Sequence, residues 1–133
     1  RINKNTWRGR KPYLVMDAYG QSKLGNILFS NVLAERLRDI GITSNALHPG
    51  GVDTPIFRHV PKAAMALIRP TLTTPEKAAT LPVSLALDPQ YADITGEYFA
   101  NHKPALRSPR ARNQKLAEEL YFDTMAELDL PTL

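Results

Sequence analysis

Residues 17–51 read DAYGQSKLGNILFSNVLAERLRDIGITSNALHPGG and join a helical pattern to a short β-rich segment and a proline–glycine turn. We expect Asp17 to cap the helix with its carboxylate and Gly41 to end it in the left-handed conformation. Residues 42–47 predict a strand that ends at His48-Pro49-Gly50-Gly51, because proline cannot donate to a sheet. The apolar positions of the helix recur at three- and four-residue steps, and they are Leu24, Ile27, Leu28, Val32, Leu33, Leu37 and Ile40.

The rest of the chain continues to alternate between helix and strand. Prolines in residues 55–73 predict a loop with one short helix, and Thr74-Pro75 predicts the start of another, interrupted at Pro82 and ended by Asp88-Pro89. Residues 94–99 predict a second strand, and Ser108-Pro109 predicts the start of the last helix. That helix has one apolar stripe, formed by Leu116, Leu120, Tyr121, Met125 and Leu128.

This order of elements predicts an α/β fold, but two strands are too few for an independent sheet. The chain begins with Arg1 rather than Met, so we expect the missing strands in a preceding segment. Residues 1–133 are then the C-terminal part of one domain.

Composition excludes several functional classes. The 133 residues contain no cysteine, which excludes disulfide scaffolds and thiolate zinc sites. His59 and His102 lack partners at ligand spacing, so we expect no metal. No apolar stretch approaches the roughly 18 residues of a membrane span. The net charge of +4 comes with few aromatics beside the basic groups, which indicates solvated surface rather than nucleic-acid binding; these groups are Arg1, Lys4, Arg8, Arg10 and Lys11, and Lys103, Arg107, Arg110, Arg112 and Lys115.

Tyr19 and Lys23 are the clearest candidates for chemistry. They lie four residues apart, so a helix places them on one face. A phenol has a reference pKa of about 10, and a neighbouring ammonium stabilises its ionised form. Such a pair suits acid/base catalysis of an alcohol–carbonyl interconversion. The same spacing also arises where a tyrosine packs and a lysine extends to solvent.

Two ordered motifs distinguish between these interpretations. Residues 19–26, YGQSKLGN, and residues 45–54, NALHPGGVDT, resemble the YxxxK helix and the post-strand PG motif of the short-chain dehydrogenase/reductase family. Within it the spelling resembles the retinol-dehydrogenase-like branch, including forms fused to WW domains. The stretch 95–99 and the Ser108-Pro109 helix start also resemble the end of these enzymes. The resemblance covers nearly the whole chain.

The resemblance implies the C-terminal half of a doubly wound parallel-sheet Rossmann fold and an NAD(P)-dependent oxidoreductase. Tyr19 would be the catalytic acid/base, and Lys23 would bind the nicotinamide ribose and make the phenol more acidic; both would contact the cofactor. The cofactor would be NADP or NAD, with NADP slightly favoured. The remaining cofactor contacts implied are Pro49, Gly50, Gly51, Val52 and Thr54.

Several other positions allow either a functional or a structural interpretation. The apolar segment after the turn, where the family places a substrate lid, is either that lid or an ordinarily packed short helix. Its residues are Ile56, Phe57, Met65, Leu67 and Ile68. His48 either contacts a ligand or orients the turn, and Asp53 suits a capping or surface role. We interpret Thr6 as a loop hydroxyl, because the resemblance implies a catalytic serine before Arg1.

We therefore predict hydride transfer between a nicotinamide cofactor and a lipophilic, retinoid-like alcohol or carbonyl. The alternative is a non-catalytic truncated or partner-binding fragment that binds no cofactor. The expected partners are a small-molecule substrate and a second copy in a homodimer, without nucleic acid. The expected location is the cytoplasm or a membrane reached through a preceding segment. We expect the 133 residues alone to be inactive, because the glycine-rich phosphate turn implied by the resemblance is not among them.

Overall fold

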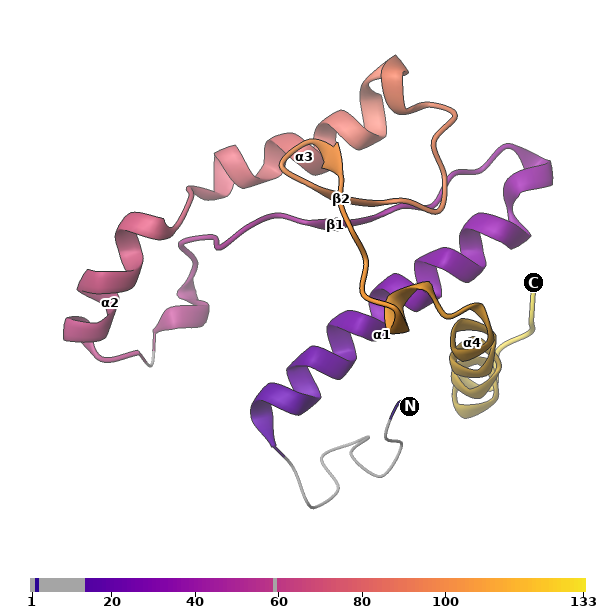
Figure 1. Ribbon diagram of the computed structural model, residues 1–133, viewed down its shortest axis with the longest axis horizontal. Helices are drawn as coiled ribbons and strands as arrows, with labels where there is room; N and C mark the ends of the chain where they lie inside the picture. The colour runs from indigo at the N-terminus through magenta and orange to yellow at the C-terminus, as the bar shows by residue number, and fades with distance from the viewer. Residues whose placement is uncertain (1, 3–13, 59) are drawn as a thin grey trace. The chain divides into compact units, whose positions relative to one another are not determined.

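The computed structural model describes residues 2, 14–58 and 60–133 (Figure 1). It combines helices with a small sheet, which confirms the α/β class. The helices and strands are α1 (Val15–Arg36), β1 (Ala46–His48), α2 (Lys62–Ile68), α3 (Pro75–Leu87), β2 (Tyr98–Ala100), β3 (Lys103–Pro104) and α4 (Gln114–Leu128). The strands form one sheet in the order β1-β2-β3, and β2 pairs antiparallel with β3 so that Phe99 lies opposite Pro104.

The chain forms two compact units. Unit 1 comprises Arg1–Ala46, Ile94–Tyr98 and Leu106–Leu133, and unit 2 comprises Leu47–Asp93 and Phe99–Ala105. Among the described residues, no helix combines the length and the hydropathy needed to cross a bilayer. Thr6, His59 and the first basic group, Arg1 to Lys11, lie outside the described residues.

In unit 1, α1 packs against α4, which Figure 1 shows nearly end-on. The core consists of Leu28, Val32, Ala117 and Tyr121, all fully buried. Four of the five predicted stripe residues of α4 belong to this core or pack against it. The prediction is wrong for Leu128, which is 58% exposed, because α4 ends there and Asp129 turns left-handed (φ 52°).

The predicted boundaries of α1 need correction. The helix begins at Val15, so Asp17 is not its cap but lies in the first turn. A carboxylate there still interacts favourably with the positive end of the helix dipole. Gly41 adopts the predicted left-handed conformation (φ 72°), but it follows a 3₁₀ turn, Arg38–Ile40, while α1 ends at Arg36.

The predicted strands are longer than the observed ones. Asn45 explains the difference: its side-chain amide donates to the Ile94 carbonyl (2.6 Å) and its side-chain oxygen accepts from the Glu97 amide (3.0 Å). Backbone that is joined through a side chain in this way is not a regular strand. The sequence pattern does not predict β3.

The ends of the later helices follow their capping residues. Thr74 accepts from the Lys77 amide at the start of α3, as predicted, and Asp88 follows its end. Pro82 lies inside α3 rather than interrupting it; it is exposed, so the carbonyl that loses a partner can face solvent. α4 begins after Asn113, whose side chain accepts from the Leu116 amide, and the predicted start at Ser108 opens only a 3₁₀ turn.

Arg107 departs from the expectation of a solvated basic group. Its guanidinium donates to Asn31 Oδ1 (3.0 Å) and to the Gly96 carbonyl (2.8 Å). It therefore connects α1 to the segment before β2 within unit 1.

Candidate active site

Tyr19 and Lys23 lie together on α1 in unit 1, on one face as their spacing predicts. The Lys23 Nζ lies 5.3 Å from the centroid of the Tyr19 ring, which is a cation–π distance. Both side chains are exposed, Tyr19 by 55%. Within the described part of the chain, the Tyr19 hydroxyl has no hydrogen-bond partner. The phenol is therefore held beside an ammonium and is open to an external ligand.

The turn after β1 lies in unit 2 and contains two adjacent glycines, Gly50 and Gly51. Gly50 has a φ of 83°, a left-handed conformation that strains any residue with a Cβ. A Cβ on Gly51 would lie 2.9 Å from Leu72 Cδ2, so a side chain there would displace Leu72. The turn thus presents bare main chain, which a flat ring can approach closely.

Val52 leaves this turn in an extended segment that pairs with Thr73. The Thr73 amide donates to the Gly51 carbonyl (2.8 Å), and the Asp53 amide donates to the Thr73 carbonyl (2.9 Å). In a parallel bridge the intervening residue directs its own amide and carbonyl to the opposite side. The main-chain polar groups of Val52 therefore point away from Thr73.

Thr54 and Asp53 follow in the same segment. Thr54 precedes the 3₁₀ turn Pro55–Phe57, and its side chain makes no cap hydrogen bond. The Asp53 carboxylate accepts from Arg69 Nε (2.9 Å), an exposed ion pair. Asp53 thus has the surface role expected of it.

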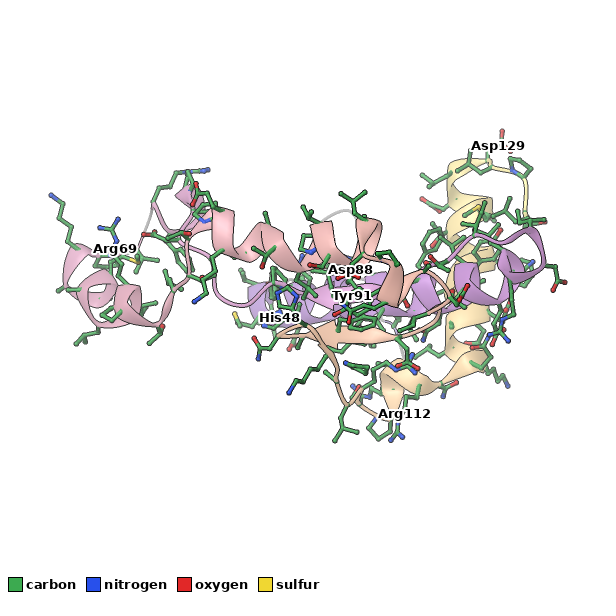
Figure 2. The ribbon with its side chains drawn as sticks, turned by 90° about the horizontal axis from the view of Figure 1, so that it is seen from above. His48, Arg69, Asp88, Tyr91, Arg112 and Asp129 are labelled. Atoms are coloured by element: carbon green, nitrogen blue, oxygen red, sulfur yellow. The ribbon has the colours of Figure 1, made fainter. Side chains whose placement is uncertain are left out.

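A cavity of about 310 Å³ adjoins the turn within unit 2. His48 lies on its wall, at the end of β1 (Figure 2). The sequence motifs point to His48 and the turn but not to the rest of this lining, because no motif marks the other residues. The cavity is lined by His48, Pro49, Gly50, Gly51, Thr71, Thr73, Lys77, Ala78, Thr80, Leu81, Asn101 and His102.

The candidate lid residues lie in the 3₁₀ turn Pro55–Phe57 and in α2. Helix α2 buries none of its residues: Leu67 is 82% exposed, Ile68 is exposed, and Met65 is half-buried. Phe57 is also half-buried, while the side chain of Ile56 lies outside the described part. Helix α2 therefore leaves most of its apolar surface exposed within the described residues.

The structure thus groups the predicted site residues into two sets. Tyr19 and Lys23 belong to unit 1, whereas the turn, Val52, Thr54 and the lid segment belong to unit 2. In residues 2, 14–58 and 60–133, no three His, Asp or Glu side chains gather closely enough to hold a metal ion. His102 instead lies 3.1 Å from the Thr80 hydroxyl through its Nε2.

Residues 2–64 match the family model of the short chain dehydrogenases. Retinol dehydrogenase 12 of Bos taurus is 37% identical over 123 residues, which cover 91% of this chain and 39% of that protein. Retinol dehydrogenase 13 of Homo sapiens is 34% identical, over 96% of this chain and 41% of that protein. Short-chain dehydrogenase TIC 32 A, chloroplastic, of Brassica napus is 39% identical, over 82% of this chain and 36% of that protein. The chain spans about two fifths of the length of these curated relatives.

Proposed function

The chain belongs to the short-chain dehydrogenase/reductase family, and from this premise we propose that it supplies the proton-transfer pair and the nicotinamide-side turn of an NAD(P)-dependent oxidoreductase. The reaction interconverts an alcohol and a carbonyl. The observation that carries the proposal is the Lys23 ammonium over the ring of Tyr19, whose hydroxyl is exposed and has no partner among the described residues.

Tyr19 acts as the acid/base in this proposal. When a carbonyl is reduced, the Oη of Tyr19 donates a proton to the carbonyl oxygen of the substrate. When an alcohol is oxidised, the same Oη accepts a proton. The nicotinamide cofactor, when bound, supplies or accepts the hydride. Lys23 places a positive charge beside the ring of the residue that gives up the proton. Its ammonium also donates a hydrogen bond to the ribose of the cofactor.

The turn in unit 2 fits the nicotinamide end of such a cofactor. Gly50 and Gly51 leave the main chain uncovered, and a Cβ built on Gly50 would meet open space. Val52 directs an amide and a carbonyl away from Thr73, and these can pair with a carboxamide group, which needs one donor and one acceptor. Pro49 and Thr54 flank this segment. Residues at the carboxyl end of a strand commonly bind ligands in open α/β sheets.

The substrate in this proposal is lipophilic. The exposed apolar side chains of α2, led by Leu67 and Ile68, follow the turn along the chain, and we propose them as the lid of the substrate site. Several relatives are named retinol dehydrogenases, which supports a retinoid-like substrate class. A lid of this kind excludes water from the reacting carbonyl.

We also propose that residues 1–133 form the C-terminal part of one Rossmann domain. The matches cover only about two fifths of each relative, and the chain has no glycine-rich strand–helix turn that could hold a diphosphate. The experiments on this proposal therefore use the complete enzyme, meaning this chain preceded by its cofactor-binding half.

Replacement of Tyr19 by phenylalanine tests the function. Tyr19→Phe removes only the hydroxyl, so turnover should fall about 100- to 10,000-fold, the usual contribution of general acid/base catalysis. Cofactor affinity should stay within a few-fold. Tyr98→Phe is the matched control, because Tyr98 is half-buried in β2 and has no hydrogen-bond partner within the described residues. Steady-state kinetics with all-trans-retinal and NADPH or NADH would contradict the proposal if both variants kept wild-type turnover.

A further inference from the structure

The cavity in unit 2 is lined by hydrogen-bond donors and by no carboxylate. Lys77 contributes an ammonium from α3, and His48 and His102 contribute imidazoles. Asn101 adds an amide and Thr73 a hydroxyl, whereas the hydroxyls of Thr71 and Thr80 already donate to the carbonyls of Ile68 and Lys77. No aspartate or glutamate is part of the lining. The lining therefore carries a net positive charge.

The cationic group of this cavity is free to bind a ligand. Among the residues that the structure describes, the Lys77 ammonium has no ion-pair or hydrogen-bond partner, and the side chains of His48 and Asn101 have none either. The Asp53 carboxylate, which is not part of the lining, is paired with Arg69. Arg69 lies far along unit 2 from His48 (Figure 2), so this pair does not neutralise the cavity.

His102 forms a fixed wall. The Thr80 hydroxyl donates its one hydrogen to the Lys77 carbonyl (2.8 Å). In its contact with His102 Nε2 (3.1 Å) the hydroxyl can therefore only accept, so Nε2 carries a hydrogen. The Tyr91 hydroxyl donates to the His102 carbonyl (3.1 Å). Asn101 and His102 both adopt left-handed conformations, with φ of 51° and 61°. These contacts hold the wall in place before any ligand arrives.

We propose that this cavity binds a small organic anion or phosphate, with the Lys77 ammonium as its charge partner. His48, Thr73 and Asn101 donate the accompanying hydrogen bonds. The volume of about 310 Å³ lies at the lower end of the range for ligand pockets, which suits a small molecule with one acidic group. The four side chains that would hold the anion are not among the proposed cofactor contacts, although Pro49, Gly50 and Gly51 of the proposed cofactor turn also line the cavity.

Binding is tested on the complete enzyme by titration with inorganic phosphate and with pentanoate, while NMR follows the imidazole signals of His48 and His102. Pentanamide is the neutral match of pentanoate. At least one anion should bind saturably, with a Kd of about 1 mM or tighter, and pentanamide should not bind. Saturation by phosphate alone identifies the acidic group as a phosphate, and saturation by pentanoate alone identifies a carboxylate. Absence of saturable shifts with both overturns the proposal.

Three variants assign the site to its residues. Lys77→Met should weaken anion binding about 10-fold or more, because it removes a charged hydrogen-bond donor, while Lys77→Arg should retain most of it. Lys62→Met is the matched control, since Lys62 is exposed on α2 and is not part of the lining. Equal losses in Lys77→Met and Lys62→Met overturn the proposal.

The last two measurements separate this site from the proposed oxidoreductase function. Tyr19→Phe should leave anion binding unchanged, so failure of the hydride-transfer proposal does not affect this result. Competition between NADPH and the anion would overturn the proposal of a distinct anion site, because it would place the anion where the cofactor binds.

Discussion

The two halves of α1 differ in what surrounds them. From Leu28 to Arg36 the helix is packed: Leu28 and Val32 are fully buried, and the Arg36 guanidinium lies 4.6 Å from the Tyr121 ring centroid and pairs with Glu118 at 2.9 Å. From Val15 to Lys23 the helix is open, and Met16 is 76% exposed. The candidate catalytic pair lies in the open half.

The difference shows how one helix serves two purposes. The packed half anchors α1 against α4, so it fixes where the open half projects. The open half carries exposed apolar and polar side chains, among them Met16 and Tyr19, which suits a surface that receives a cofactor, a substrate and further strands. Stability and chemistry can therefore be changed separately along this helix.

The 133-residue chain on its own gives the largest expected effect. It contains the open half of α1 but no glycine-rich turn for a diphosphate, so we expect no detectable binding of NADPH or NADH. Titration calorimetry on the purified chain measures this, with the complete enzyme as the control. Micromolar binding by a monodisperse chain would show that the open half needs no further segment.

Leu28→Ala tests the packed half. The side chain is fully buried beside Tyr121 and Ala117, so its truncation should lower the free energy of unfolding of the complete enzyme by about 2–5 kcal/mol. Met16→Ala in the open half should change it by less than about 0.5 kcal/mol. Denaturant unfolding compares the two. A large loss in Met16→Ala would show that another part of the enzyme covers the open half.

Lys23→Met tests the chemical role of the open half. The substitution keeps most of the side-chain length and removes the charge, so cofactor binding should weaken by about 1.5–3 kcal/mol, or roughly 10- to 150-fold in Kd. Turnover should fall as well. Lys23→Arg should restore part of the cofactor affinity. If the Kd for NADPH and the turnover both remain at wild-type values, Lys23 is a surface lysine only.

Two glycines give the smallest expected effects, and with opposite signs. Gly20 lies in the open half of α1, and a Cβ added there would meet open space, so Gly20→Ala should stabilise the enzyme by about 0.5–1 kcal/mol. Gly50→Ala should destabilise it by about 1–2 kcal/mol, because φ is 83° there. Denaturant midpoints measure both. If Gly50→Ala stabilised the enzyme as Gly20→Ala should, the turn would have relaxed into a conformation other than the one described.

The sequence predicts well what neighbouring residues determine. The helix α1, the Thr74 cap of α3 and the left-handed Gly41 all depend on residues within one or two turns of each other, and each is observed. The predicted apolar stripe fails at its end, because α1 stops at Arg36 and Ile40 is 66% exposed. The predicted start of α1 is wrong because Asp17 is a good capping residue that the helix passes over. Local preference alone does not decide between two nearby starts.

Features that depend on distant residues could not be predicted in this way. Asn45 shortens two strands by contacting residues 94 and 97, which lie about fifty positions later in the chain. The cavity brings His48 together with Lys77 and Asn101, and no spacing in the sequence relates these three residues. The pairing of Tyr19 with Lys23 could be predicted, because it is a contact within one helical turn.

The double contact of Asn45 also fixes the register of two segments. One side chain donates to residue 94 and accepts from residue 97, so a slip by a single residue would break both hydrogen bonds at once. A slip of that size in a strand would also turn every side chain to the opposite face. Short strands such as β1 and β2 have few ladder hydrogen bonds of their own to prevent it. Asn45 therefore sets the register between the segment that leads into β1 and the residues that precede β2.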